Sequence, residues 1–168
     1  LFRVTLNNHT QLSQIADSKA NILLSVNAIL ISIALSTLVP KLDSANNAHL
    51  IIPTCILVFF SVISIVFAIL STRPKLHDYK YKEGDLETRK VNLLFFGNFN
   101  QIPMDKYVNA IEDLMKEPDY LYQSLIKDLY YLGKVLDRKY KLLRITYNVF
   151  MFGIIISVIF FGIAIFRL

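Results

Sequence analysis

The chain has 168 residues, of which 54% are hydrophobic and only 18% are charged. Its mean hydropathy of +0.46 is too high for an ordinary water-soluble domain, so these values exclude most soluble folds. The net charge of +5 lies mostly beside apolar segments, and no concentrated basic face with stacking aromatic residues indicates nucleic-acid binding. We therefore expect an integral membrane protein that does not bind nucleic acid.

Three apolar runs predict the fold class. They cover residues 20–39, 50–71 and 146–166, and none contains Asp, Glu, Lys, Arg or His. Each is close to the ~20 residues that a helix needs to cross the hydrocarbon core of a bilayer. The runs lack the alternating pattern of strands, whereas a helix satisfies its own backbone hydrogen bonds in lipid. The sequence predicts an all-α integral membrane protein with three transmembrane helices.

The distribution of Lys and Arg predicts the orientation of these helices, because cytoplasmic flanks retain positive charge. Lys41 and Arg167 lie on one side, and the other basic residues near the spans lie on the opposite side. We expect one membrane module with its N-terminus in the cytoplasm and its C-terminus outside. Its predicted parts are a cytoplasmic helix at 1–19, an outer turn at 40–49 and a cytoplasmic segment at 72–145.

The cytoplasmic segment contains an apolar patch and two predicted helices. The patch, VNLLFFGNF at 91–99, is too short to span a membrane; it could be a strand, lie at the lipid headgroups or dock against the helices, and we favour docking. Pro103 begins a helix to about Lys116, and Pro118 begins the next one. Leucines at helical spacing continue that last helix, of about 48 residues, into the third span. The first helix is predicted to extend into the cytoplasm as well, and because the chain starts within it at Leu1 without a methionine, we expect a fragment.

The titratable residues do not predict an enzyme. His9, His49 and His77 are scattered along the chain and match no metal-ligand spacing. The dipeptide His77-Asp78 is interpreted as part of a solvated loop. Cys55 lies inside the second apolar run and is interpreted as a small buried hydrophobic residue. We therefore predict no catalytic residue, no metal site and no cofactor.

Small residues recur at helical spacing on one face of each apolar run. Such stripes let helix backbones approach closely in lipid, where burial of apolar surface provides little drive for association. Close helix packing is the simpler interpretation, and a water-filled path lined by serine hydroxyls in an oligomer is the alternative. The predicted packing residues are Ala28, Ser32, Ser36, Ser61, Ser64, Ala68, Gly153 and Ser157.

Polar residues at the entry of the first span form a second candidate set. Asp17 and Lys19 are expected at the cytoplasmic edge of the membrane, whereas Asn21 and Asn27 lie deeper. An amide inside a span needs a hydrogen-bond partner, and polar groups at that depth are functional candidates. Asp17, Lys19, Asn21, Ser25 and Asn27 are therefore candidate gating residues, with structural hydrogen bonding between helices as the alternative.

A basic cluster directly precedes the third span. Arg138, Lys139, Lys141 and Arg144 are expected at the level of the lipid headgroups. Positive side chains at this level orient a span and bind anionic lipids. We interpret these four residues as lipid-headgroup anchors, with anionic lipids as their partners.

Several segments resemble one known family. The pattern ADxKAxxLLSxNA at 16–28, the segment LLFFGNF at 93–99 and the run DYLYxSLxKDLYxLGxVLxRKYxLLRITY at 119–147 are similar to the membrane domain of bacterial Pycsar effectors. The resemblance covers nearly the whole chain. It implies an antiphage effector of the bacterial inner membrane. In that family a companion cyclase makes a cyclic pyrimidine mononucleotide during infection, and the effector then impairs the membrane.

The resulting hypothesis is a membrane effector that forms homo-oligomers and impairs the inner membrane to halt growth of infected cells. A cyclic nucleotide or a sensor domain is the implied trigger, although the chain has no recognisable nucleotide-binding domain. Similar domains also occur joined to sensor or phosphohydrolase domains. The alternative is therefore a passive membrane anchor or oligomerisation module for such a domain.

Overall fold

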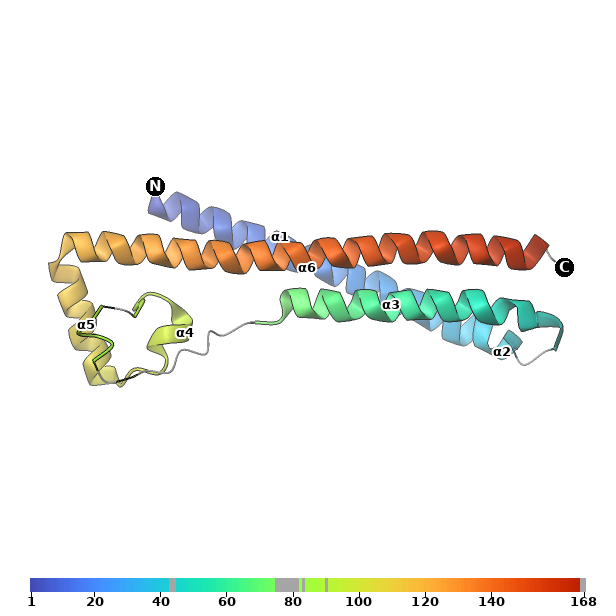
Figure 1. Ribbon diagram of the computed structural model, residues 1–168, viewed down its shortest axis with the longest axis horizontal. Helices are drawn as coiled ribbons and strands as arrows, with labels where there is room; N and C mark the ends of the chain where they lie inside the picture. The colour runs from blue at the N-terminus through green and yellow to red at the C-terminus, as the bar shows by residue number, and fades with distance from the viewer. Residues whose placement is uncertain (43–44, 75–81, 83, 90, 167–168) are drawn as a thin grey trace. The chain divides into compact units, whose positions relative to one another are not determined.

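The computed structural model describes residues 1–42, 45–74, 82, 84–89 and 91–166 (Figure 1). All regular elements in these residues are helices, and no strand occurs among them. His77, Asp78 and Arg167 lie outside the described residues. In chain order the elements are α1 (Phe2–Ile33), the π-helix η1 (Ala34–Leu38), α2 (Val39–Leu42), the 3-10 helix η2 (Ala45–Leu50), α3 (Ile51–Thr72), α4 (Phe96–Phe99), α5 (Met104–Lys116) and α6 (Pro118–Phe166).

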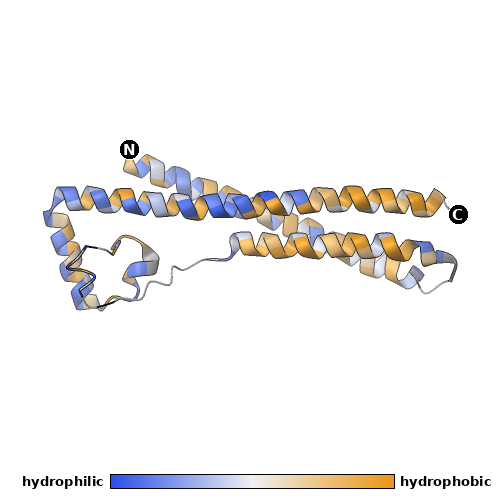
Figure 2. Ribbon diagram, in the orientation of Figure 1, coloured by the Kyte–Doolittle hydropathy of each residue, from blue (hydrophilic) through white to orange (hydrophobic). Residues whose placement is uncertain are grey.

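Three helical segments are long and apolar enough to cross a membrane, as the sequence predicted. They are Phe2–Lys41, Asn47–Thr72 and Pro118–Phe166. Figure 2 shows hydrophobic residues along α3 and along the C-terminal part of α6, while the N-terminal part of α6 is richer in hydrophilic residues. The 49 residues of α6 correspond to roughly 70 Å at 1.5 Å per residue, so only part of this helix is needed to span a bilayer.

Most of the residues in the predicted outer turn at 40–49 lie in short helices. α2 includes Pro40, and η2 covers the second half of the predicted turn. Proline lacks an N–H group and cannot donate to the preceding helical turn. The chain accommodates this through η1, where the backbone N–H of Val39 donates to the carbonyl of Ala34, and the Thr37 hydroxyl donates to the carbonyl of Ile33 at 2.6 Å.

The chain divides into two compact units. The first unit comprises Leu1–Gln11 and Pro74–Leu136, and the second comprises Leu12–Arg73 and Asp137–Leu168. Both α1 and α6 therefore contribute residues to each unit. The second unit contains the apolar runs, and it holds most of the residues that the sequence singled out.

The first unit has a hydrophobic core to which the 91–99 segment contributes. Val91, Leu93, Ile102 and Leu114 are buried, and Leu93 and Leu114 are each 1% exposed. Full burial of a leucine side chain stabilises a fold by about 1.5–3 kcal/mol. The docking interpretation of this segment is therefore confirmed for its buried residues. The partly buried residues packed against the core are Leu86, Leu94, Phe99, Tyr107, Ala110, Ile111, Tyr120 and Leu121.

Candidate functional site: polar contacts among the spanning helices

One face of α1 is buried in the second unit. Ala16, Ala20, Leu23 and Asn27 follow one another at intervals of three or four residues, which places them on one side of a helix. The two alanines are fully buried and form a cluster with Leu23 and with Leu143 of α6. Because alanine side chains are small, the backbones of α1 and α6 can approach closely at this level.

Asn27 joins α1 to α3 by a hydrogen bond. Its side-chain amide is fully buried and donates to the hydroxyl of Ser64 at 3.1 Å and to the backbone carbonyl of Leu23 at 2.8 Å. Both Asn27 and Ser64 are 0% exposed. A hydrogen bond between spanning helices contributes about 0.6–2 kcal/mol. The amide nitrogen of Asn27 therefore has the partner inside the span that the sequence analysis predicted.

The acceptor side of the same amide has no partner among the described residues. The Oδ1 atom of Asn27 is buried, and none of these residues donates a hydrogen bond to it. A buried polar atom without a partner costs about 1–3 kcal/mol. Asn27 therefore forms a hydrogen bond between helices and also carries an unsatisfied acceptor. A change in helix packing would alter the hydrogen bonding of this residue.

A group of polar residues lies where the first span begins, and we name Ser13, Asp17, Ser71 and Lys139 the interfacial polar cluster. The ammonium of Lys139 on α6 donates to both carboxylate oxygens of Asp17 and to the hydroxyl of Ser13 on α1, each at 2.9 Å. The hydroxyl of Ser71 on α3 donates to the backbone carbonyl of Lys139 at 3.1 Å. This cluster therefore joins all three spanning helices.

Gly153 lies at a close contact between α3 and α6. A methyl group added at this position would lie 2.4 Å from the Cβ atom of Phe60. Ser157 lies one turn further along α6 and is 1% exposed, with its hydroxyl bonded to the carbonyl of Gly153 at 2.7 Å. On α3, Ser61 and Ala68 are also buried, at 4% and 0% exposure. These predicted packing residues therefore lie inside the second unit rather than on its surface.

The predicted stripe on α1 is exposed. Ala28, Ser32 and Ser36 lie on the surface of the second unit, together with Asn21 and Ser25. The Ser25 hydroxyl donates to the carbonyl of Asn21 at 3.0 Å, which satisfies it within its own helix. Two stripes of α1 thus have different surroundings: the face with Asn27 contacts α3 and α6, and the face with Ala28 is not covered by any of the residues that the structure describes.

The basic residues before the third span also differ from one another. Arg138, Lys141 and Arg144 are exposed, and Lys141 pairs with Asp137 one turn earlier at 2.6 Å. Lys139 instead turns toward α1 and is only 19% exposed. Lys19 is exposed. The role of the exposed side chains as headgroup anchors stays a prediction.

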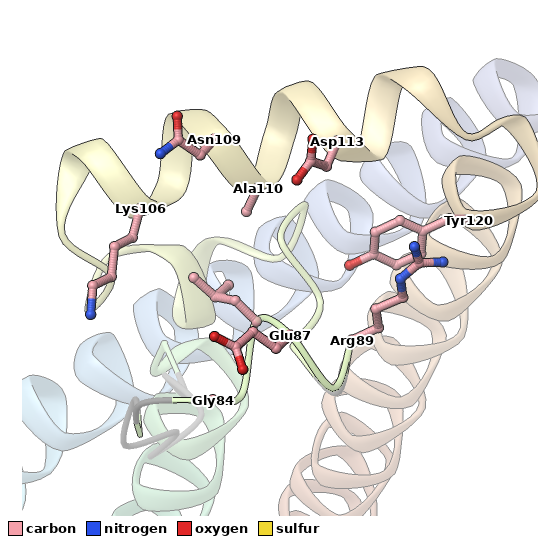
Figure 3. A pocket seen from close by; sticks show the side chains of 9 residues that line it. Gly84, Glu87, Arg89, Lys106, Asn109, Ala110, Asp113 and Tyr120 are labelled. Carbon is pink, nitrogen blue, oxygen red and sulfur yellow. The ribbon is translucent and has the colours of Figure 1, made fainter.

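The first unit contains an open hollow of about 590 Å³. Figure 3 shows Lys106, Asn109 and Asp113 along α5 and Arg89 beside the ring of Tyr120. The Arg89 guanidinium lies 4.6 Å from the centre of that ring. The other residues that line the hollow are Gly84, Leu86, Glu87 and Ala110.

Two of the charged residues that line this hollow pair with residues beside it. Arg89 donates to both carboxylate oxygens of Glu117, at 2.7 and 2.5 Å, and Lys116 pairs with Asp113 at 3.2 Å. The hydrogen bond from Arg89 lowers the pKa of Glu117 below its usual value and raises the pKa of Arg89. The described lining residues include the basic Arg89 and Lys106 and the acidic Glu87 and Asp113, so they favour neither an anion nor a cation.

Sequence reasoning missed the pairing of Asp17 with Lys139 and the contributions of Ser13 and Ser71. Asp17 was predicted as a gating residue and Lys139 as a lipid anchor, and no pattern in the sequence connects them. Asp17 lies three residues before the first apolar run and Lys139 seven residues before the third, and this shared position just outside a span is the signal that could have suggested an ion pair between helices. Among the described residues, no group of three or more His, Cys, Asp and Glu is placed to hold a metal ion. Cys55 is exposed on α3 and not buried as predicted, because the buried face of α3 there is formed by Pro53 and Thr54.

Comparison with known proteins gives one family match. The family model described as "Pycsar effector protein domain" matches residues 1–166 of the chain. No match was found among curated proteins or among solved structures.

Proposed function

The chain belongs to the Pycsar effector protein domain family, and on that premise we propose that it assembles into homo-oligomers that impair the integrity of the bacterial inner membrane. Family membership and the three apolar helices support a membrane effector in antiphage defence. In the proposed mechanism, a signal made during infection changes how the spanning helices pack. A cyclic pyrimidine mononucleotide, acting directly or through a sensor domain, is the proposed trigger.

The exposed polar stripe of α1 is the observation that carries the proposal of homo-oligomers. Asn21, Ser25, Ala28 and Ser32 of α1, and Ser36 of η1, are exposed within the predicted span at 20–39, which is otherwise mostly apolar. Polar side chains are costly when they face lipid, and small residues on one face favour close contact with another helix. The same stripe on a second copy of the chain would satisfy both requirements.

Disulfide crosslinking between copies tests this contact. In a Cys55→Ala background, Ala28→Cys should form dimers rapidly in vesicles. Val26→Cys, which is also exposed but lies on nearly the opposite side of α1, is the matched control and should crosslink at least about tenfold more slowly. Equal rates for the two variants would contradict assembly through this stripe.

A leakage assay tests membrane impairment. The purified chain is placed in vesicles of phosphatidylethanolamine and phosphatidylglycerol that contain a self-quenched dye. We expect dye release on addition of a cyclic pyrimidine mononucleotide, or of an activated sensor domain supplied with it. Vesicles that stay tight under each of these conditions would contradict the proposal and favour a passive anchor.

The proposed orientation has its own test. We propose that the N-terminus and the segment after α3 lie in the cytoplasm and that α2 lies outside. In intact cells, a membrane-impermeant thiol reagent should label Lys41→Cys, whereas Arg73→Cys should react only after the membrane is permeabilised. Both positions are exposed, so accessibility within the protein does not limit either reaction. The reverse labelling pattern would contradict the orientation.

A further inference from the structure

We propose that the ion pair between Asp17 and Lys139 is a lock that holds α1 against α6, and that it opens before the membrane is impaired. The inference rests on the proposed function for its consequence, but the lock itself can be measured separately. The pair lies on the two helices that contribute to both units of the chain.

The hydrogen-bonding capacity of Lys139 is fully used. An ammonium group has three donors, and here two reach the carboxylate oxygens of Asp17 and one reaches the hydroxyl of Ser13. All three contacts measure 2.9 Å, which is typical of strong charge-assisted hydrogen bonds. The Lys139 side chain is therefore held in one position on α1.

Two further hydrogen bonds, each to a backbone carbonyl, hold the turn of α6 that contains Lys139. The Tyr140 hydroxyl donates to the carbonyl of Leu12 on α1 at 3.1 Å, and Ser71 of α3 donates to the carbonyl of Lys139. Two consecutive residues of α6 thus bind both other spanning helices. A rotation or shift of α6 at this level would break several polar contacts together.

Apolar contacts lie beside the cluster. They come from Ala16, Ala20, Leu23 and Leu143, with Tyr140 and Phe150 packed against them. Burial of apolar surface gives helices in lipid little drive to associate, so close packing and hydrogen bonds hold them together. The polar contacts of Lys139 are specific bonds that α1 and α6 lose when they separate and that lipid tails cannot replace.

The position of the pair allows it to open. Asp17 lies three residues before the apolar run that begins at Ala20, and its side chain is 40% exposed. After separation both charged groups can reach water or lipid headgroups, which long lysine side chains do readily near helix ends. An ion pair at the centre of the bilayer would have no such alternative and would act as a permanent contact.

The lock is measured by crosslinking between α1 and α6. In a Cys55→Ala background, Ala20→Cys and Leu143→Cys place two thiols in one buried cluster, and they should form an intramolecular disulfide. Adding Asp17→Asn or Lys139→Met should slow this reaction by about tenfold, a change that corresponds to about 1.4 kcal/mol. The exchanged pair, Asp17→Lys with Lys139→Asp, should restore most of the rate.

Lys141→Met is the matched control, because it removes a lysine whose ion pair with Asp137 is exposed and lies within one helix. It should leave the crosslinking rate unchanged. Unchanged crosslinking in both single variants would overturn the lock. So would an exchanged pair that crosslinks as slowly as the single variants. Recovery of the rate in the exchanged pair would show that slow crosslinking reflects the lost ion pair rather than failed insertion.

The consequence is measured by dye leakage from the same vesicles. Vesicles with either single variant should leak without a trigger, at about ten times the rate of the unchanged chain, and the exchanged pair should be tight. If crosslinking falls in the single variants while their vesicles stay tight, the proposal that opening leads to leakage is overturned. A further outcome is that the unchanged chain causes leakage when triggered while the untriggered single variants leak no faster than the untriggered unchanged chain. In that case the lock does not control leakage.

Discussion

The side-chain amide of Asn27 donates to the hydroxyl of Ser64 over 3.1 Å, and this hydrogen bond joins α1 to α3 within their apolar parts. Both residues are fully buried. Lipid offers no replacement partner for either group, so separation of the two helices leaves them unsatisfied unless another polar group replaces the contact. Asn27 also carries an acceptor without a partner in the described part of the chain, so the same residue both strengthens and destabilises the packed arrangement.

Ser64→Ala should lower the free energy of unfolding by about 0.6–2 kcal/mol, the range found for hydrogen bonds between spanning helices. The measurement is unfolding by a denaturing detergent in mixed micelles, followed by circular dichroism. Ser61→Ala is the control, because Ser61 is buried one turn away on α3 but forms no described hydrogen bond with α1. Equal effects of the two substitutions would mean that the hydrogen bond contributes nothing beyond packing.

Asn27→Leu should separate stability from activity. The substitution removes a buried polar amide, which lowers the cost of placing the first helix in lipid, but it also leaves the buried Ser64 hydroxyl without its hydrogen bond from α1. Insertion of the chain into a membrane should therefore improve. If the amide takes part in gating, triggered dye release should fall at least about tenfold, since a loss of about 1.4 kcal/mol changes an equilibrium by that factor. Unchanged release would assign Asn27 to packing alone.

Gly153→Ala should destabilise the contact between α3 and α6. The added methyl would lie 2.4 Å from the Cβ atom of Phe60, so the helices would have to move apart. Such overpacking costs about 1–3 kcal/mol, which outweighs the gain in helix propensity of up to about 1 kcal/mol. Gly162→Ala is the matched control on the same helix, because apart from its own turn of helix no atom of the described residues lies within 4 Å of its added methyl. Detergent-induced unfolding should show a loss for the first variant and no loss for the second.

The sequence predicted the helices well because their signals are local. Uninterrupted apolar runs identify spans, and Pro103 and Pro118 lie at the starts of α5 and α6. The short helices within the predicted turn after the first span could not be recognised from such signals, because the Pro and Asn residues that indicate a turn also occur in the first turns of helices. The sequence of residues 40–49 is therefore compatible both with a turn and with short helices.

The contacts between helices could not be predicted in the same way. Asp17 and Lys139 are 122 residues apart, and the period of a helix does not specify which residue of another helix lies opposite. α1 also has two stripes of small or polar residues, one with Asn27 and one with Ala28. The first stripe is buried and the second is exposed because of how the three helices pack, which the sequence of α1 alone does not specify.

Leu114→Ala should destabilise the first unit by about 2–5 kcal/mol, as is typical when a buried leucine is truncated and a cavity remains. Leu114 is 1% exposed and packs with Leu93 and Val91. Limited proteolysis of the full chain in detergent should cleave the variant faster within residues 84–118. Met115→Ala is the control, because its side chain is 63% exposed on the same helix. Similar cleavage of both variants would mean that the 91–93 segment does not depend on α5.

The ion pair between Arg89 and Glu117 should make the first unit sensitive to acid. The hydrogen bond from Arg89 lowers the pKa of Glu117 from its ordinary value of 4.5. Because the folded pKa is depressed, the stabilisation from this pair is present above the ordinary pKa and is lost as the pH falls through the folded value. An NMR titration of the Glu117 carboxyl carbon should therefore give a midpoint below 4.5, and Arg89→Gln should raise it. Lys116→Gln removes a neighbouring exposed lysine that pairs with Asp113 instead, and it should leave the midpoint almost unchanged. A Glu117 midpoint that is the same with and without Arg89 would contradict the bidentate contact.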